Sequence, residues 1–281
     1  MVVGSGSLIL GVPDSSQPAD YGVAGYGNWC APEAAADLLG YWEDVRGCVG
    51  LTDRQVSPAS PAYPATAGTW QQGLWHDGSV ELGWFMDTGF WQTLSLPFPP
   101  NAGSTLVTII GPGTVNYARS GWTDAGTGIA KVGYGSASTT KDTVLNQAMW
   151  TKYVSEINAG NPVLVSFDAW VQVPGGLAAT VPVNGQSVDE YNLWTSGPSH
   201  CVCAVGYIDP TPTVLNGDEW MIVQDNNAST SRYVAVPLGS AASTHWLQNR
   251  LYCDTGTCHG LPAPHGWASV TACPTKSLSV L

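Results

Sequence analysis

A cysteine stands directly at the head of a helical pattern near the start of the chain. Apolar residues after it recur at helical spacing, namely Leu38, Tyr41, Trp42 and Val45. Pro32 suits a first helical turn, and Gly47 suits a helix end. The pattern therefore predicts a helix that begins at Cys30 and ends near Arg46.

Two interpretations of Cys30 follow from this placement. The unpaired N–H groups and the dipole at a helix N-terminus favour an anion, so a thiol there loses its proton more easily than in open solution. A free cysteine, however, is also among the most buried residue types and often serves only as a small hydrophobe. The presence of a base and an orienting group elsewhere in the chain would distinguish a nucleophile from a structural thiol.

Two strand patterns later in the chain supply candidate partners. Residues 200–208 and 219–225 each favour a strand, and the segment between them is rich in Pro, Asp, Asn and Gly. The sequence predicts an antiparallel pair in which His200 opens the first strand and Asp225 closes the second.

The expected register brings these two side chains together. If the ends that flank the loop pair, Ile208 lies opposite Glu219 and Val202 lies opposite Asp225. His200 shares a face with Val202 and then stands one diagonal step from Asp225. A shift of one residue would separate them.

An imidazole oriented by a carboxylate can take the proton of a thiol to form a thiolate and imidazolium pair. Cys30, His200 and Asp225 meet this requirement as nucleophile, base and orienter. Asn226 is the alternative orienter, and it would face the opposite side of the strand if the strand runs that far.

Three parts of the chain resemble the papain-like cysteine peptidases. The similarity is to the branch of the bacteriocin-processing peptidases and to the bacterial immunoglobulin-degrading cysteine endopeptidases. The matching parts are residues 29–42, 157–165, and 199–207 with 220–226. The resemblance implies an α+β fold in which the N-terminal nucleophile helix packs on an antiparallel sheet. It also implies catalysis by Cys30, His200 and Asp225 on a polypeptide substrate through a thioester, with no cofactor.

The chain departs from this family before the cysteine. Such peptidases usually carry a glutamine about half a dozen residues upstream that helps to hold the oxyanion, and Ala24 occupies that neighbourhood. Gln17 and Asn28 are the candidates for the role, and the backbone N–H of Cys30 can supply one donor. The departure supports a rival interpretation, an inactive peptidase-like extracellular protein that self-associates or contacts glycans through an uncharged, Trp-rich surface.

Composition excludes several partners. Only 11% of the 281 residues are charged and the net charge is −12, which argues against nucleic acid and anionic membranes. No apolar run is long enough for a membrane span, and no signal peptide is visible in this numbering. We expect a secreted or cell-surface protein.

The cysteine count also favours a secreted or cell-surface protein. Seven cysteines leave six beside one nucleophile, an even number that suits disulfides. Cys253 and Cys258 flank a turn-like segment and are the expected local pair. Cys201 and Cys203 are expected to pack as hydrophobes or to pair elsewhere. A zinc site at His200, Cys201 and Cys203 lacks a second ligand pair, so no metal is expected.

The sequence predicts one papain-like domain over residues 1–281 with two additions. Residues 69–140 form a Trp- and Gly-rich insertion, expected to be rich in β structure with a strand at 106–110. Residues 250–281 form an irregular tail that contains cysteines. The 13 tryptophans favour core and insertion packing over a sugar-stacking surface.

Overall fold

The computed structural model describes residues 5–14, 30–52, 82–83, 85–86, 105, 107–123, 130–142, 147–167, 171–172, 177–191, 194–195, 200–209, 215, 219–226, 232–237, 257–258, 261–262 and 269–272. The chain divides into two compact units. The first comprises Met1–Leu10 and Lys141–Ala272, and the second comprises Gly11–Thr140 and Cys273–Leu281.

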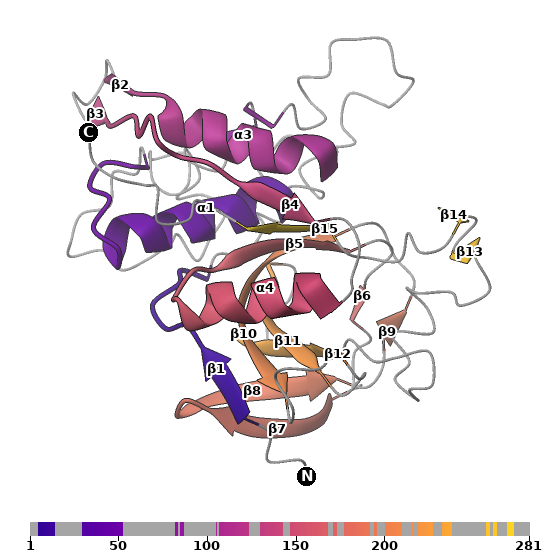
Figure 1. Ribbon diagram of the computed structural model, residues 1–281. Helices are drawn as coiled ribbons and strands as arrows, with labels where there is room; N and C mark the ends of the chain where they lie inside the picture. The colour runs from indigo at the N-terminus through magenta and orange to yellow at the C-terminus, as the bar shows by residue number, and fades with distance from the viewer. Residues whose placement is uncertain are drawn as a thin grey trace, which may run out of the picture. The chain divides into compact units, whose positions relative to one another are not determined.

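One large sheet dominates the described residues (Figure 1). Its nine strands include β1 (Ser5–Leu8), which pairs with β10 beside the main path. The main path runs in the order β4 (Thr140–Asp142), β15 (Ser269–Ala272), β5 (Val163–Phe167), β10 (His200–Asp209), β11 (Trp220–Gln224), β12 (Val234–Pro237), β8 (Gln186–Tyr191) and β7 (Leu177–Val183). The pairs that β10 makes with β1, β5 and β11 are all antiparallel, whereas β12 and β8 pair in parallel. The α+β class and the antiparallel surroundings predicted for His200 are confirmed.

Helix α4 (Gln147–Asn158) covers part of this sheet and contacts β1, β5, β10 and β15. Its buried residues follow helical spacing: Met149, Trp150, Tyr153, Val154 and Ile157. Gly160 lies two residues beyond the end of α4 and has a φ of +76°. Its N–H donates to the carbonyl of Ile157, and the N–H of Asn161 donates to the carbonyl of Glu156. This Schellman arrangement turns the chain directly into β5.

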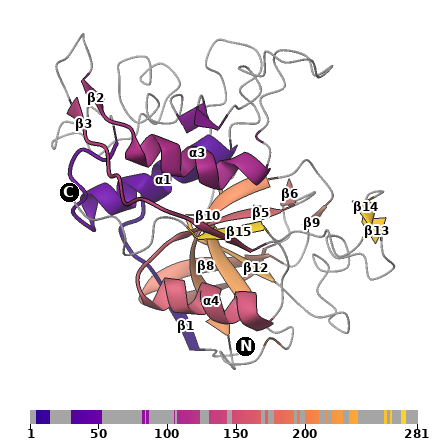
Figure 2. The ribbon, with the colours of Figure 1, turned by 45° about the horizontal axis from the view of Figure 1, so that its top comes forward.

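The second unit contains helices α1 (Cys30–Asp44) and α3 (Val107–Arg119), which lie side by side in Figures 1 and 2. Helix α1 begins at Cys30 as predicted, and residues 31–42 are all buried. Beyond its end, Gly47 has a φ of +76°, a left-handed conformation that glycine adopts without strain.

The carboxylate of Glu43 ties the end of α1 to the loop that follows it. It accepts hydrogen bonds from the N–H of Gly50 at 3.1 Å and the N–H of Thr52 at 2.9 Å, and also from the Thr52 hydroxyl. A single side chain thus holds three donors in place at the end of the helix that begins with Cys30.

We expect Glu43→Ala to lower the free energy of unfolding by about 2–3 kcal/mol, because three partly buried donors lose a charged acceptor. Val49→Ala is the control, since Val49 lies in the same loop and is 74% exposed, and its change should stay within about 0.5 kcal/mol. Urea unfolding of both variants measures the difference. Equal effects would show that Glu43 does not hold this loop.

The strand predicted at 106–110 is wrong, because residues 107–110 belong to helix α3. The β-branched run Val107–Ile110 favours a strand locally, and a proline at position 112 is unfavourable inside a helix. Pro112 is exposed on α3 together with Asn116 and Arg119, at helical spacing, while the opposite side is buried. Close packing of Gly113 permits this, since a Cβ there would lie 2.6 Å from Cγ of Met86. Tertiary contacts therefore override the local preference.

The other short strands form small pairs. They are β2 (Trp122–Thr123) with β3 (Ala130–Lys131), β6 (Val171–Gln172) with β9 (Trp194–Thr195), and β13 (Thr257–Cys258) with β14 (Leu261–Pro262).

Within 69–140, the described residues contain a helix and little β structure. The tail, expected to be irregular, contributes β15 to the main sheet, where Val270 lies opposite Val165. Pairing with so distant a strand leaves no local pattern.

Candidate active site

The register between β10 and β11 differs from the prediction at one end and agrees with it at the other. Near the loop, Ile208 lies opposite Trp220, so the predicted pairing with Glu219 is wrong. The register then shifts between Ala204 and Gly206, and Cys203 lies opposite Gln224. One step further, this register sets Val202 against Asp225, as predicted. A β-bulge at Val205 accounts for the difference, because it inserts one residue into β10.

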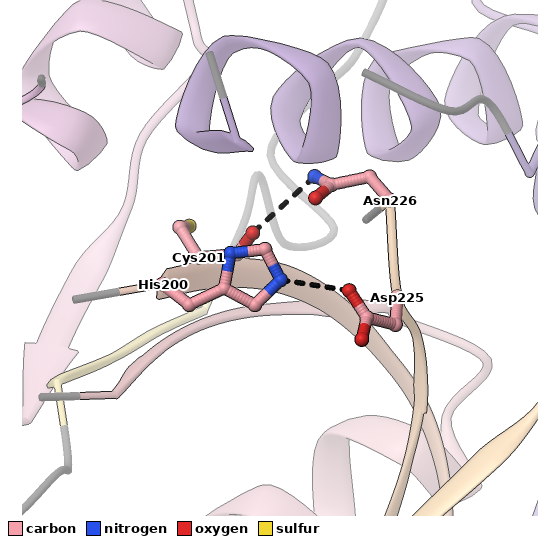
Figure 3. A network of polar contacts seen from close by, with 4 residues as sticks. All are labelled: His200, Cys201, Asp225 and Asn226. Atoms are coloured by element: carbon pink, nitrogen blue, oxygen red, sulfur yellow. Dashed lines mark hydrogen bonds and ion pairs between the residues drawn. The ribbon is translucent and has the colours of Figure 1, made fainter. Parts of the chain in front are cut away.

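Beyond the bulge, His200 and Asp225 lie together, and Figure 3 shows their contact. The Nε2 atom of His200 lies 2.8 Å from Oδ1 of Asp225, and both side chains are buried. Buried polar groups are costly unless they are hydrogen-bonded, so each side chain stabilises the other in this position. The predicted proximity of the two residues is confirmed, and the contact fixes which ring nitrogen faces the carboxylate.

Asn226, next to Asp225, makes a different contact with β10. Its side-chain amide donates to the carbonyl of Cys201 at 3.3 Å, as Figure 3 shows. Strand β11 ends at Gln224, and both Asp225 and Asn226 are buried beyond it. Of the two candidate orienters, Asp225 therefore contacts the imidazole, whereas Asn226 ties the end of β11 back to β10.

Cys30 occupies the position that the sequence predicts for a reactive thiol. It is the first residue of α1 and is partly exposed, whereas the next twelve residues are buried. Glu33 follows in the first turn. Cys30 belongs to the second unit, and His200 and Asp225 belong to the first.

The other described thiols are buried and differ from Cys30 in this respect. They are Cys48, Cys201 and Cys203. Neither these three cysteines nor Cys30 is joined in a disulfide. Burial is the main cause that raises the pKa of the Cys48 thiol; Glu43 adds to it and Arg46 opposes it. In the described part of the chain, no group of three His, Cys, Asp or Glu residues could hold a metal ion.

Several predicted residues lie outside the described residues. These are the oxyanion candidates Gln17 and Asn28, and Cys253 of the expected disulfide. Cys258 is placed only as a backbone residue of β13. The oxyanion donors and the disulfide therefore stay predictions. The location outside the cell also stays a prediction.

The sequence analysis missed the bulge, although a signal was present. Gly206 interrupts the apolar strand pattern, and an isolated glycine in a strand often marks a bulge or a close approach of backbone. A Cβ at this position would lie 2.4 Å from the carbonyl oxygen of Ser7 on β1. Gly206 is thus required where β1 approaches β10 beside the bulge.

Comparison with known proteins assigns the chain to a family. The model of the Peptidase_C39 like family matches residues 9–252, which include Cys30, His200 and Asp225. No curated protein matches the chain in sequence. Among the described helices, none has the length and apolar character needed to cross a membrane.

Proposed function

We propose that this chain, which belongs to the Peptidase_C39 like family of cysteine peptidases, cleaves polypeptides with Cys30 as nucleophile, His200 as base and Asp225 as orienter. The observation that carries the assignment is the buried contact of 2.8 Å between His200 and Asp225. It supports a fixed imidazole, which is what proton transfer in the transition state requires.

The proposed reaction assigns a role to each nitrogen of His200. Because Nε2 contacts Asp225, Nδ1 is the atom that exchanges a proton with the Cys30 thiol. The position of Cys30 at the start of α1 favours the thiolate, since the helix dipole and N–H groups stabilise negative charge there. Asp225 keeps the ring orientation and stabilises the imidazolium.

The chemistry then proceeds by acyl transfer. The thiolate of Cys30 attacks the peptide carbonyl carbon, and the backbone N–H of Cys30 donates to the oxyanion that forms. As the C–N bond breaks, the imidazolium gives its proton to the leaving amine, and a thioester remains. Water, deprotonated by His200, attacks the thioester, releases the carboxylate product and restores the thiol.

The test is the rate at which iodoacetamide labels Cys30 as a function of pH, read by peptide mass spectrometry. We expect fast labelling below pH ~6 in the native chain and a return toward the behaviour of an ordinary thiol, near pH ~8.5, in His200→Ala. Cys48 is an internal control, because its raised pKa and burial should leave it unlabelled across this range.

The opposite outcome has a defined meaning. Labelling of the native Cys30 that begins only near pH ~8.5, unchanged by His200→Ala, would contradict the proposed thiolate and imidazolium pair. It would favour the inactive, peptidase-like binding protein to which the missing upstream glutamine points.

A further inference from the structure

Strand β10 changes its pairing on both edges at the bulge. On one edge, residues from His200 to Ala204 pair with β5, and those from Gly206 onward pair with β1. On the other edge, the register against β11 shifts between Ala204 and Gly206. The carbonyl of Val205, between them, accepts from the N–H of Ile9 at 2.8 Å. The register that places His200 against Asp225 is therefore decided at this one point.

A side chain from α4 contacts this point. The hydroxyl of Tyr153 donates to the carbonyl of Gly206 at 2.5 Å, and Tyr153 is 1% exposed. Burial is the main cause that raises the pKa of Tyr153 well above its ordinary value. The hydroxyl of Tyr153 therefore keeps its proton at neutral pH and remains a hydrogen-bond donor.

Neighbouring contacts hold Tyr153 in place. Its ring stacks on that of Trp150 at a centroid distance of 5.3 Å, and Trp150 donates through Nε1 to Oδ2 of the buried Asp209 at 3.0 Å. Helix α4 thus contacts β10 at two points. Trp150 contacts Asp209, the last residue of β10, and Tyr153 contacts Gly206 beside the bulge.

We propose that Tyr153 is a positioning residue, which fixes the bulge of β10 through the Gly206 carbonyl and thereby holds His200 in register with Asp225. The catalytic consequence rests on the proposed function, but the effect on His200 and Asp225 does not. A slip of one residue along β10 would turn His200 to the other face of the sheet, so a contact that holds the bulge also holds the imidazole.

The experiment compares Tyr153→Phe with Tyr207→Phe. Both changes remove one hydroxyl and keep the ring, and Tyr207 is on the same strand, where its hydroxyl donates to Oδ1 of Asn158 at 3.0 Å. NMR spectra of chains with ¹⁵N-labelled histidine report the imidazole of His200, assigned by its loss in His200→Gln. Circular dichroism and melting curves establish that each variant is folded at the temperature of measurement.

We expect Tyr153→Phe to shift the His200 imidazole signals and to speed exchange of its Nε2 proton by about tenfold or more, whereas Tyr207→Phe leaves both unchanged. Labelling of Cys30 at pH 6 should slow by about tenfold to a hundredfold in Tyr153→Phe alone, because a misplacement of about 1 Å is costly for catalysis.

Two results separate this inference from the proposed function. His200 signals that stay native in folded Tyr153→Phe, or that change equally in Tyr207→Phe, would overturn the positioning role. If the signals shift only in Tyr153→Phe while Cys30 labelling never depends on His200, the proposed peptidase mechanism fails and the positioning role stands.

Discussion

Replacing Cys30 with alanine is expected to reduce peptide cleavage by at least about a thousandfold. The sulfur forms the covalent intermediate, and without it the remaining groups can contribute only binding and oxyanion stabilisation. Helix α1 should persist, because alanine suits a helix and the buried residues of α1 begin after Cys30. The measurement is the rate at which new amino termini form in a mixed peptide library, read by mass spectrometry.

The matched control is Cys48→Ala in the same unit. Cys48 is buried and its raised pKa disfavours the thiolate, so its loss should affect stability and leave the cleavage rate near that of the native chain. Cleavage that continues at the native rate in Cys30→Ala would remove Cys30 from the mechanism. Cleavage that is lost in both variants would point to unfolding, which circular dichroism detects.

Asp225→Ala is expected to lower kcat/KM by about a hundredfold to ten-thousandfold. The change removes the carboxylate that lies 2.8 Å from Nε2 of His200, so the ring loses its fixed orientation and a partner for the imidazolium charge. The loss should fall mainly on kcat, because the interaction matters most when the imidazole is charged in the transition state.

Asn226→Ala separates orientation of the imidazole from support of the chain. Asn226 adjoins Asp225 and is also buried, but its amide contacts the carbonyl of Cys201 and not the imidazole. We expect a reduction in stability of about 1–2 kcal/mol and a much smaller loss of kcat than in Asp225→Ala. A loss of kcat in Asn226→Ala that equals or exceeds the loss in Asp225→Ala would contradict the assignment of Asp225 as the orienter.

Much of the local structure around the candidate site could be predicted from sequence. The start of α1 at Cys30 and the strands that became β10 and β11 follow from periodicity and from glycine and proline placement. These signals arise from neighbouring residues, so a single sequence contains them.

The errors have a common physical origin. The segment 106–110 has strand propensity, but residues 107–110 lie in α3, where close packing of Gly113 on Met86 outweighs that preference. Strand β15 left no recognisable pattern, because its partner β5 lies about a hundred residues earlier in the chain. Interactions between distant residues decided both.

The sequence by itself determined which chemical groups are present and which elements carry them: a thiol at a helix N-terminus, an imidazole at the start of one strand and a carboxylate at the end of another. Only the tertiary structure decided that His200 faces Asp225 and that Asn226 faces the carbonyl of Cys201. Side chains alternate between the faces of a strand, so a single inserted residue reverses which of them meet. Where that residue is inserted depends on the change of partner from β5 to β1 and on the contact from α4, which form only when the distant segments fold together.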